Sequence, residues 1–266
     1  MILFLCPKSS GYLLSKLKAV KGESKVVNKY FFRRMYVNHF ITTVDYFAKT
    51  LNQKVVPAFD NVSEEAHQAA EEAYEQASKF FDSERDDPAV LGEVAFDAEI
   101  DFGIMAFGMK QGIMNLFAAG LYHLFEQWFL KFHRRELLYM GEDGDLKLIN
   151  LEEAKNRLLS VYGIQIEAFL AWNKINELKL VANTVKHADG KSCEELKKLR
   201  PDHFAPSSLK KDGLDSGHGM IGEVFHPLAG EDLYISTEEF AKYVEAVKQF
   251  CEDLAKSFDA FEYPTG

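Results

Sequence analysis

Apolar residues recur at intervals of three and four along most of this chain, which is the spacing of amphipathic α-helices. The clearest case is the stretch from Trp172 to His187. Its apolar stripe consists of Trp172, Ile175, Leu178, Val181, Ala182 and Val185. Gly190 follows closely enough to be the left-handed residue that ends such a helix. The pattern therefore predicts one helix with an apolar face and, on another face, a group of polar residues.

The same spacing predicts further helices before and after this central one. A break in the longest of them is expected near Gly108 or Gly112, because glycine weakens a helix interior. Helix starts of the capping type, with Glu three residues after Asn or Ser, occur at Asn61, Asn150 and Ser236. The additional helices are expected over residues 30–51, 63–81, 89–138, 150–162, 192–200 and 237–258.

The order of these elements indicates the fold class. The chain has no strand-rich region, no alternation of strands with helices and no internal repeat. Residues 205–231 are rich in Gly, Ser, Pro and Asp, which predicts a long loop before the last helix. We therefore predict an all-α helical bundle in a single domain, residues 1–266. Residues 1–101 form an N-terminal helical extension, and residues 102–266 hold the core and the closing helix.

Composition favours a globular protein in a reducing compartment. Apolar residues make up 47% of the chain, which suffices for a sizeable core. The three cysteines lie far apart without a C-x-x-C pair, so neither a disulfide framework nor a structural zinc site is expected. The apolar region 102–132 is interrupted by charged and amide residues, which favours a buried helix over a membrane span. We expect a cytoplasmic protein that does not contact a membrane.

Charge is distributed unevenly along the chain. The net charge is −10, yet residues 1–54 carry +8 and residues 55–101 carry −12. An acidic segment is usually a solvated helix face, whereas a basic segment can hold nucleic acid or pack beside an acidic one. Mixed surface charge without a specific partner is the first expectation.

Sequence signatures of common enzyme classes are missing. The chain contains no P-loop, no dinucleotide-binding glycine motif, no H-E-x-x-H and no G-x-S-x-G. His123 and Glu126 have the spacing of a di-iron pair in reversed order, without the partner ligands that such a site needs. His218 and His226, in the predicted loop, are expected to be ordinary surface histidines. We therefore expect no metal and no cofactor.

The polar residues of the central helix are the remaining candidate site. Lys179, Asn183, Lys186 and His187 fall on one face, and Lys191 follows. A histidine can act as general acid or base near neutral pH, and a nearby ammonium group can stabilise charge that develops on a phosphate. These groups match metal-independent RNA cleavage, with Lys179 and Lys191 as RNA contacts. The alternative is structural, because Lys and His are favoured in the last turn of any helix.

Two stretches of the chain resemble the HEPN superfamily. They are Leu121-Tyr-His-Leu-Phe-Glu126-Gln-Trp-Phe-Leu and Trp172-Asn-Lys-Ile-Asn-Glu-Leu-Lys-Leu-Val-Ala-Asn183-Thr-Val-Lys-His187-Ala-Asp-Gly190. The resemblance implies a helical bundle of the kind found in bacterial toxin–antitoxin and phage-defence loci, where many members are metal-independent ribonucleases that act as dimers. It also implies RNA as a substrate, a homodimer and a cognate protein partner.

The family motif is an Arg, usually followed by Asn, and then a His a few residues later on the last long helix. By this resemblance Asn183 matches the motif Asn and His187 the motif His. Ala182 occupies the Arg position, so the bidentate phosphate contact of a guanidinium is lost. Lys179 or Lys186 could supply a point charge from the same face.

Three functions are compatible with these residues. The first is a metal-independent endoribonuclease, with His187 as acid/base, Lys186 or Lys179 as phosphate stabiliser and Asn183 as positioner. The second is a catalytically inactive HEPN-like module that binds RNA or protein or serves as a scaffold. The third is an antitoxin or immunity partner whose acidic segment, residues 60–101, masks a basic surface.

Overall fold

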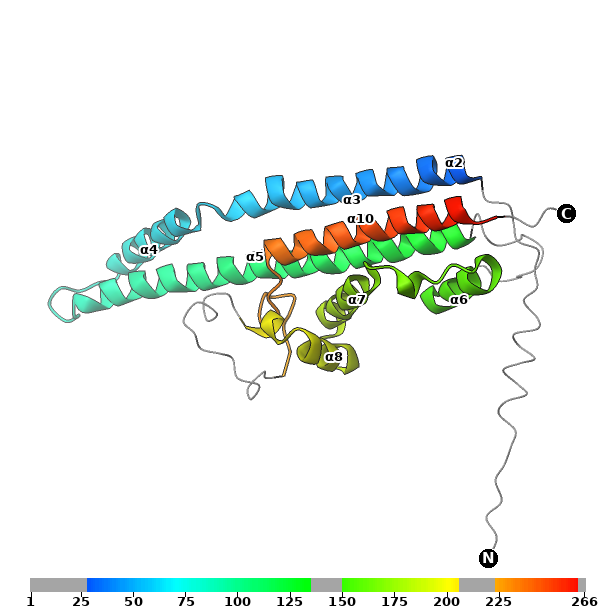
Figure 1. The fold of residues 1–266 in the computed structure, drawn as a ribbon. Helices are drawn as coiled ribbons and strands as arrows, with labels where there is room; N and C mark the ends of the chain where they lie inside the picture. The colour runs from blue at the N-terminus through cyan, green and yellow to red at the C-terminus, as the bar shows by residue number, and fades with distance from the viewer. Residues whose placement is uncertain (1–27, 135–149, 206–222, 263–266) are drawn as a thin grey trace, which may run out of the picture. The chain divides into compact units, whose positions relative to one another are not determined.

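The computed structural model describes residues 28–134, 150–205 and 223–262, and these residues form helices and connections without a strand (Figure 1). The predicted all-α helical bundle is therefore confirmed. None of the described helices combines the length and the apolar character needed to cross a membrane. Most of the predicted loop over 205–231 lies outside the described residues, as do His218 and the predicted helical positions 135–138.

The described helices follow one another in the order shown in Figure 1, whose labels are used here. They are α2 (Lys29–Phe31), the π-helix η1 (Phe32–Asn38), α3 (His39–Thr50), the π-helix η2 (Leu51–Val55), the 3₁₀-helix η3 (Val56–Phe59), α4 (Val62–Ser78), α5 (Ala89–Phe132), α6 (Leu151–Tyr162), the 3₁₀-helix η5 (Ile166–Ala168), α7 (Trp172–His187), α8 (Lys191–Leu199), the 3₁₀-helix η6 (Pro201–Phe204) and α10 (Thr237–Ala260).

The long helix α5 runs without interruption, so the break predicted at Gly108 or Gly112 is wrong. A Cβ atom at Gly112 would overlap the main-chain carbonyl of Leu228, and one at Gly108 would lie 2.8 Å from the carbonyl oxygen of Ala229. These glycines therefore let an irregular segment approach the helix backbone closely. Their cost in helix propensity, about 1 kcal/mol each, is offset by that packing.

The end of α7 also differs from the sequence expectation. The residue in the left-handed conformation is Ala188, with φ at +57°, and its amide donates to the carbonyl oxygen of Thr184 at 2.8 Å. Gly190 instead precedes α8 as its N-cap residue. A left-handed alanine costs roughly 1–2 kcal/mol, so the turn between α7 and α8 must be held by other contacts.

Contacts divide the chain into two compact units. The first contains the described residues up to Ile41, those between Leu124 and Asn173, and those from Val247 onward. Aromatic rings dominate its core: the Phe32 and Phe132 centroids lie 4.3 Å apart. Aromatic pairs of this kind contribute about 0.5–1.5 kcal/mol beyond their burial, which explains the abundance of phenylalanine in the chain.

The second unit contains the described residues between Thr42 and His123 and between Lys174 and Ala246. Its fully buried Asn115, on α5, fastens the irregular segment 223–236. The Asn115 side-chain nitrogen donates to the carbonyl oxygens of Pro227 at 2.7 Å and Leu233 at 2.8 Å. The segment is thereby fixed on α5 just before α10 begins. All the candidate site residues discussed below belong to this unit.

Candidate functional site

The predicted site residues lie on the second half of α7 and at the start of α8. Lys179, Lys186 and His187 are exposed on α7, and Lys191 is exposed as the first residue of α8. None of these four side chains forms a hydrogen bond or ion pair with another described residue. We call this group the α7–α8 corner.

Lys174 of α7 and Lys197 of α8 are paired with carboxylates, whereas Lys198 of α8 is exposed and has no such partner among the described residues. Lys197, on α8, lies 3.2 Å from Asp189 and 3.4 Å from Glu194. Its hydrogen bond lowers the pKa of the Asp189 carboxyl. The Asp189 amide in turn donates to the carbonyl oxygen of Val224 at 3.0 Å, which holds the turn that contains Ala188. The corner thus has a fixed backbone and cationic side chains that face solvent.

Asn183 and Ala182 have environments that the sequence alone did not predict. Asn183 is half-buried, and its side-chain nitrogen donates to the Ser192 hydroxyl at 3.2 Å, so it joins α7 to the start of α8. Ala182 is fully buried. The motif position that the resemblance assigns to Arg therefore faces the core, where a guanidinium would lose its hydration.

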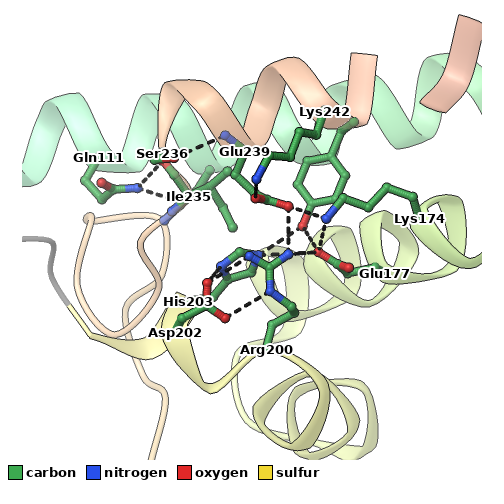
Figure 2. Close-up of polar contacts among 12 residues, drawn as sticks. Gln111, Lys174, Glu177, Arg200, Asp202, His203, Ile235, Ser236, Glu239 and Lys242 are labelled. Carbon is green, nitrogen blue, oxygen red and sulfur yellow. Dashed lines mark hydrogen bonds and ion pairs between the residues drawn. The ribbon is translucent and has the colours of Figure 1, made fainter. Parts of the chain in front are cut away.

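A second polar site, which sequence reasoning missed, lies in the interior of the same unit (Figure 2). We call it the ion cluster, and it joins α7, η6 and α10. The buried groups are Glu177, His203, Glu239 and Tyr243, and the cations that contact them are Lys174, Arg200 and Lys242.

Glu177 lies at the centre of the ion cluster. One of its oxygens accepts from the Tyr243 hydroxyl at 2.7 Å, from the Lys174 ammonium at 2.8 Å, and from the Arg200 guanidinium. Burial opposes ionisation of Glu177, but hydrogen bonds with His203, Lys174 and Tyr243 outweigh it and lower the pKa to about 2. The carboxylate is therefore ionised at neutral pH despite its burial.

Glu239 occupies the α10 side of the cluster. Its first oxygen accepts from Arg200 at 2.7 Å and from Lys174, and its second accepts from Lys242 at 3.0 Å. Burial again opposes ionisation, but these three cations hold the pKa of Glu239 well below its usual range. The Glu239 amide donates to the Ser236 hydroxyl at 3.1 Å, so Ser236 caps α10 as the predicted helix start requires.

Glu177, His203 and Glu239 could each offer one ligand atom to a metal ion, since those atoms lie within 4.8 Å of one another. Both carboxylates, however, already face Lys174 and Arg200. A dication would have to displace two half-buried cations whose charges balance the carboxylates. The arrangement fits a network of ion pairs that holds α7, η6 and α10 together better than it fits a metal centre.

Little in the sequence could have revealed this cluster. Lys174 and Glu177 are three residues apart on one helix, a common exposed pair. Glu239 reads as the acid of a capping box, and His203 follows a proline in a short connection. Only the tertiary fold brings these positions together.

No protein-family model, curated protein or solved structure matches this chain. The geometry of the α7–α8 corner and of the ion cluster is therefore the basis for a functional assignment.

Proposed function

We propose that the α7–α8 corner binds RNA and that the chain is a HEPN-like, metal-independent endoribonuclease. The observation that supports this most is that the cations of the corner have no carboxylate partner, whereas several neighbouring cations do. The protein is acidic overall, and Lys174, Lys197 and Arg200 are all neutralised by carboxylates. The corner nevertheless keeps three ammonium groups and an imidazole without an acidic partner among the described residues. Such a group is suited to a polyanion.

The proposed reaction needs one proton transfer in each direction. The imidazole of His187 takes the proton of a ribose 2′-hydroxyl, whose oxygen attacks the adjacent phosphorus. The bond from phosphorus to the 5′-oxygen breaks, and that oxygen receives a proton. The products are a 2′,3′-cyclic phosphate and a 5′-hydroxyl end. Lys186 stabilises the charge on the phosphate, and Lys179 and Lys191 hold the flanking backbone.

Asn183 acts in this proposal as a positioning residue, because its side chain holds Ser192 and hence the first turn of α8 that bears Lys191. One imidazole cannot be base and acid at the same moment. A homodimer that brings the His187 of the partner subunit to the same phosphate therefore belongs to the proposal.

A HEPN-like module that binds RNA without cutting it is the second candidate. It is favoured by the burial of Ala182, which leaves no guanidinium at the motif position. A role in a toxin–antitoxin or phage-defence system belongs to the first candidate, because only cleavage would make the chain an effector.

The test compares four proteins on mixed single-stranded RNA with chelator present: wild type, His187→Ala, the pair Lys186→Ala and Lys191→Ala, and His67→Ala. His67 is an exposed histidine of α4 and serves as the matched control. We expect wild type and the control to cleave, His187→Ala to bind without cleaving, and the lysine pair to bind weakly.

The outcomes separate the candidates. Binding without cleavage by wild type would replace the ribonuclease by the binding module. Cleavage that persists in His187→Ala would show that another group, or a contaminant, carries the activity. Equal RNA affinity of wild type and the lysine pair would exclude the α7–α8 corner as the RNA surface.

A further inference from the structure

The N-terminal half of α5 carries a row of apolar side chains that face solvent. Phe96, Ile100, Ile104 and Phe107 are 62%, 42%, 67% and 52% exposed, and successive members are three or four residues apart. They therefore share one face of the helix, over a length of roughly 17 Å. We call this row the α5 stripe.

The α5 stripe continues a face that is buried further along the same helix. Met114 lies seven residues after Phe107, Ala118 four after Met114, and Leu121 three after Ala118, so they continue the same face. All three are buried. One face of one helix is thus core in its second half and exposed in its first. Exposed patches of this kind mark surfaces that bind another protein.

A groove lies between α4 and this part of α5, with a volume of about 580 Å³. Its lining includes the small residues Ala70 and Gly92 and the aromatic residues Tyr74 and Phe96. Glu71, Glu75 and Glu99 also line it. The lining of the groove is therefore partly apolar and partly anionic.

Two glycines of α5 leave open space beside the helix backbone on this face. A Cβ atom at Gly92 or Gly103 would meet nothing within 4 Å, whereas Gly108 and Gly112 are needed for packing against residues 228–230. Glycine in a helix interior costs about 1 kcal/mol. Within the described residues Gly92 and Gly103 have no contact that offsets this cost.

We propose that the α5 stripe and the α4–α5 groove bind a cationic amphipathic helix of a partner protein, a function beyond RNA binding at the α7–α8 corner. The apolar side of that helix covers the stripe. Its Lys or Arg side chains enter the groove, where the faces of Tyr74 and Phe96 and the carboxylates of Glu71 and Glu99 attract a cation.

The negative charge around the groove favours a basic helix as its partner over a second copy of the chain. Residues 55–101 carry −12, and they include all of α4 and the first part of α5. Two such surfaces would repel each other, whereas a basic helix gains attraction along the whole edge of the groove.

The test uses the full chain and a synthetic peptide of about 18 residues with Leu on one helical face and Lys and Arg on the other. Fluorescence anisotropy measures its Kd for wild type, for the pair Glu71→Lys and Glu99→Lys, and for Ile104→Asp. The control pair, Glu65→Lys and Asp101→Lys, makes the same change in net charge on the same two helices, outside the groove.

We expect the groove pair and Ile104→Asp each to weaken binding by about tenfold or more, and the control pair to leave it within about twofold of wild type. A peptide of the same composition with scrambled faces should bind much more weakly. Equal weakening by the control pair, or equal binding of the scrambled peptide, would overturn the proposal in favour of general charge attraction. A wild-type dimer that Ile104→Asp converts to a monomer would overturn it in favour of a second copy.

Discussion

The Tyr243 hydroxyl donates a hydrogen bond to Glu177 at 2.7 Å and lies 3.0 Å from Nε2 of His203, so one phenol joins the acid of α7 to the imidazole of η6. Burial and the Glu177 charge raise the pKa of Tyr243 far above its ordinary value, which keeps the phenol neutral. The contact therefore lasts across the whole physiological pH range.

Removal of this hydroxyl should destabilise the protein. In Tyr243→Phe, Glu177 loses one donor and His203 one partner while the ring packing is kept, so we expect a loss of about 1–3 kcal/mol. Denaturant unfolding at neutral pH measures it. Tyr46→Phe, at a largely exposed tyrosine of α3, is the control and should change stability by less than about 0.5 kcal/mol. Equal effects of both substitutions would contradict the role given to the cluster.

The ion cluster should make the protein sensitive to acid. The folded pKa of Glu177, about 2, is below its ordinary value of 4.5, so its stabilising contribution is complete above pH 4.5 and is lost as the pH falls towards 2. The loss is on the order of 2–3 kcal/mol. Unfolding free energies measured between pH 6 and pH 2.5 should fall less steeply for Glu177→Gln than for wild type. Glu75→Gln, at an exposed acid, should follow the wild-type slope.

Ala188→Gly should stabilise the protein, although glycine usually does the opposite. Ala188 has a φ of +57°, and glycine reaches that conformation without the Cβ clash. We expect a gain of about 1 kcal/mol, seen as a higher denaturation midpoint. Ala241→Gly, at an exposed position within α10, should instead lose about 1 kcal/mol. A loss in both variants would show that the turn does not need its left-handed residue.

Two glycines of the same helix should respond in opposite directions to alanine. Gly112→Ala places a methyl group against the backbone of Leu228, which cannot move aside without disturbing Asn115, so we expect a loss of several kcal/mol. Gly103→Ala adds a methyl group in open space and gains helix propensity, about 1 kcal/mol. Thermal unfolding of the two variants beside wild type gives the comparison.

The helical parts of the fold followed from local sequence. The central helix begins at Trp172, where its apolar stripe begins, although it ends at His187 with Ala188 rather than Gly190 as the left-handed residue. Asn150 caps α6 by accepting from the Glu153 amide at 2.9 Å, as predicted. These features depend on neighbours within a few residues, so their signal is local.

The errors concern positions whose role depends on distant parts of the chain. Gly112 looked like a helix breaker because its partner, Leu228, lies far along the sequence. The bond from Asn183 to Ser192, which joins α7 to α8, likewise could not be read from the sequence. Each charged residue of the ion cluster has an ordinary sequence context. Their structural role depends on burial, which a single sequence does not specify.

The irregular segment 223–236 contacts α5 through Asn115 and the α7–α8 turn through the bond between Asp189 and Val224. The segment therefore has two attachment points, one on α5 and one on the α7–α8 turn. Weakening of the Asn115 hydrogen bonds should loosen the second attachment as well, so the hydrogen-exchange rate of the Asp189 amide reports on the Asn115 contacts. The placement of His187 is therefore maintained from a helix that carries none of the proposed catalytic groups.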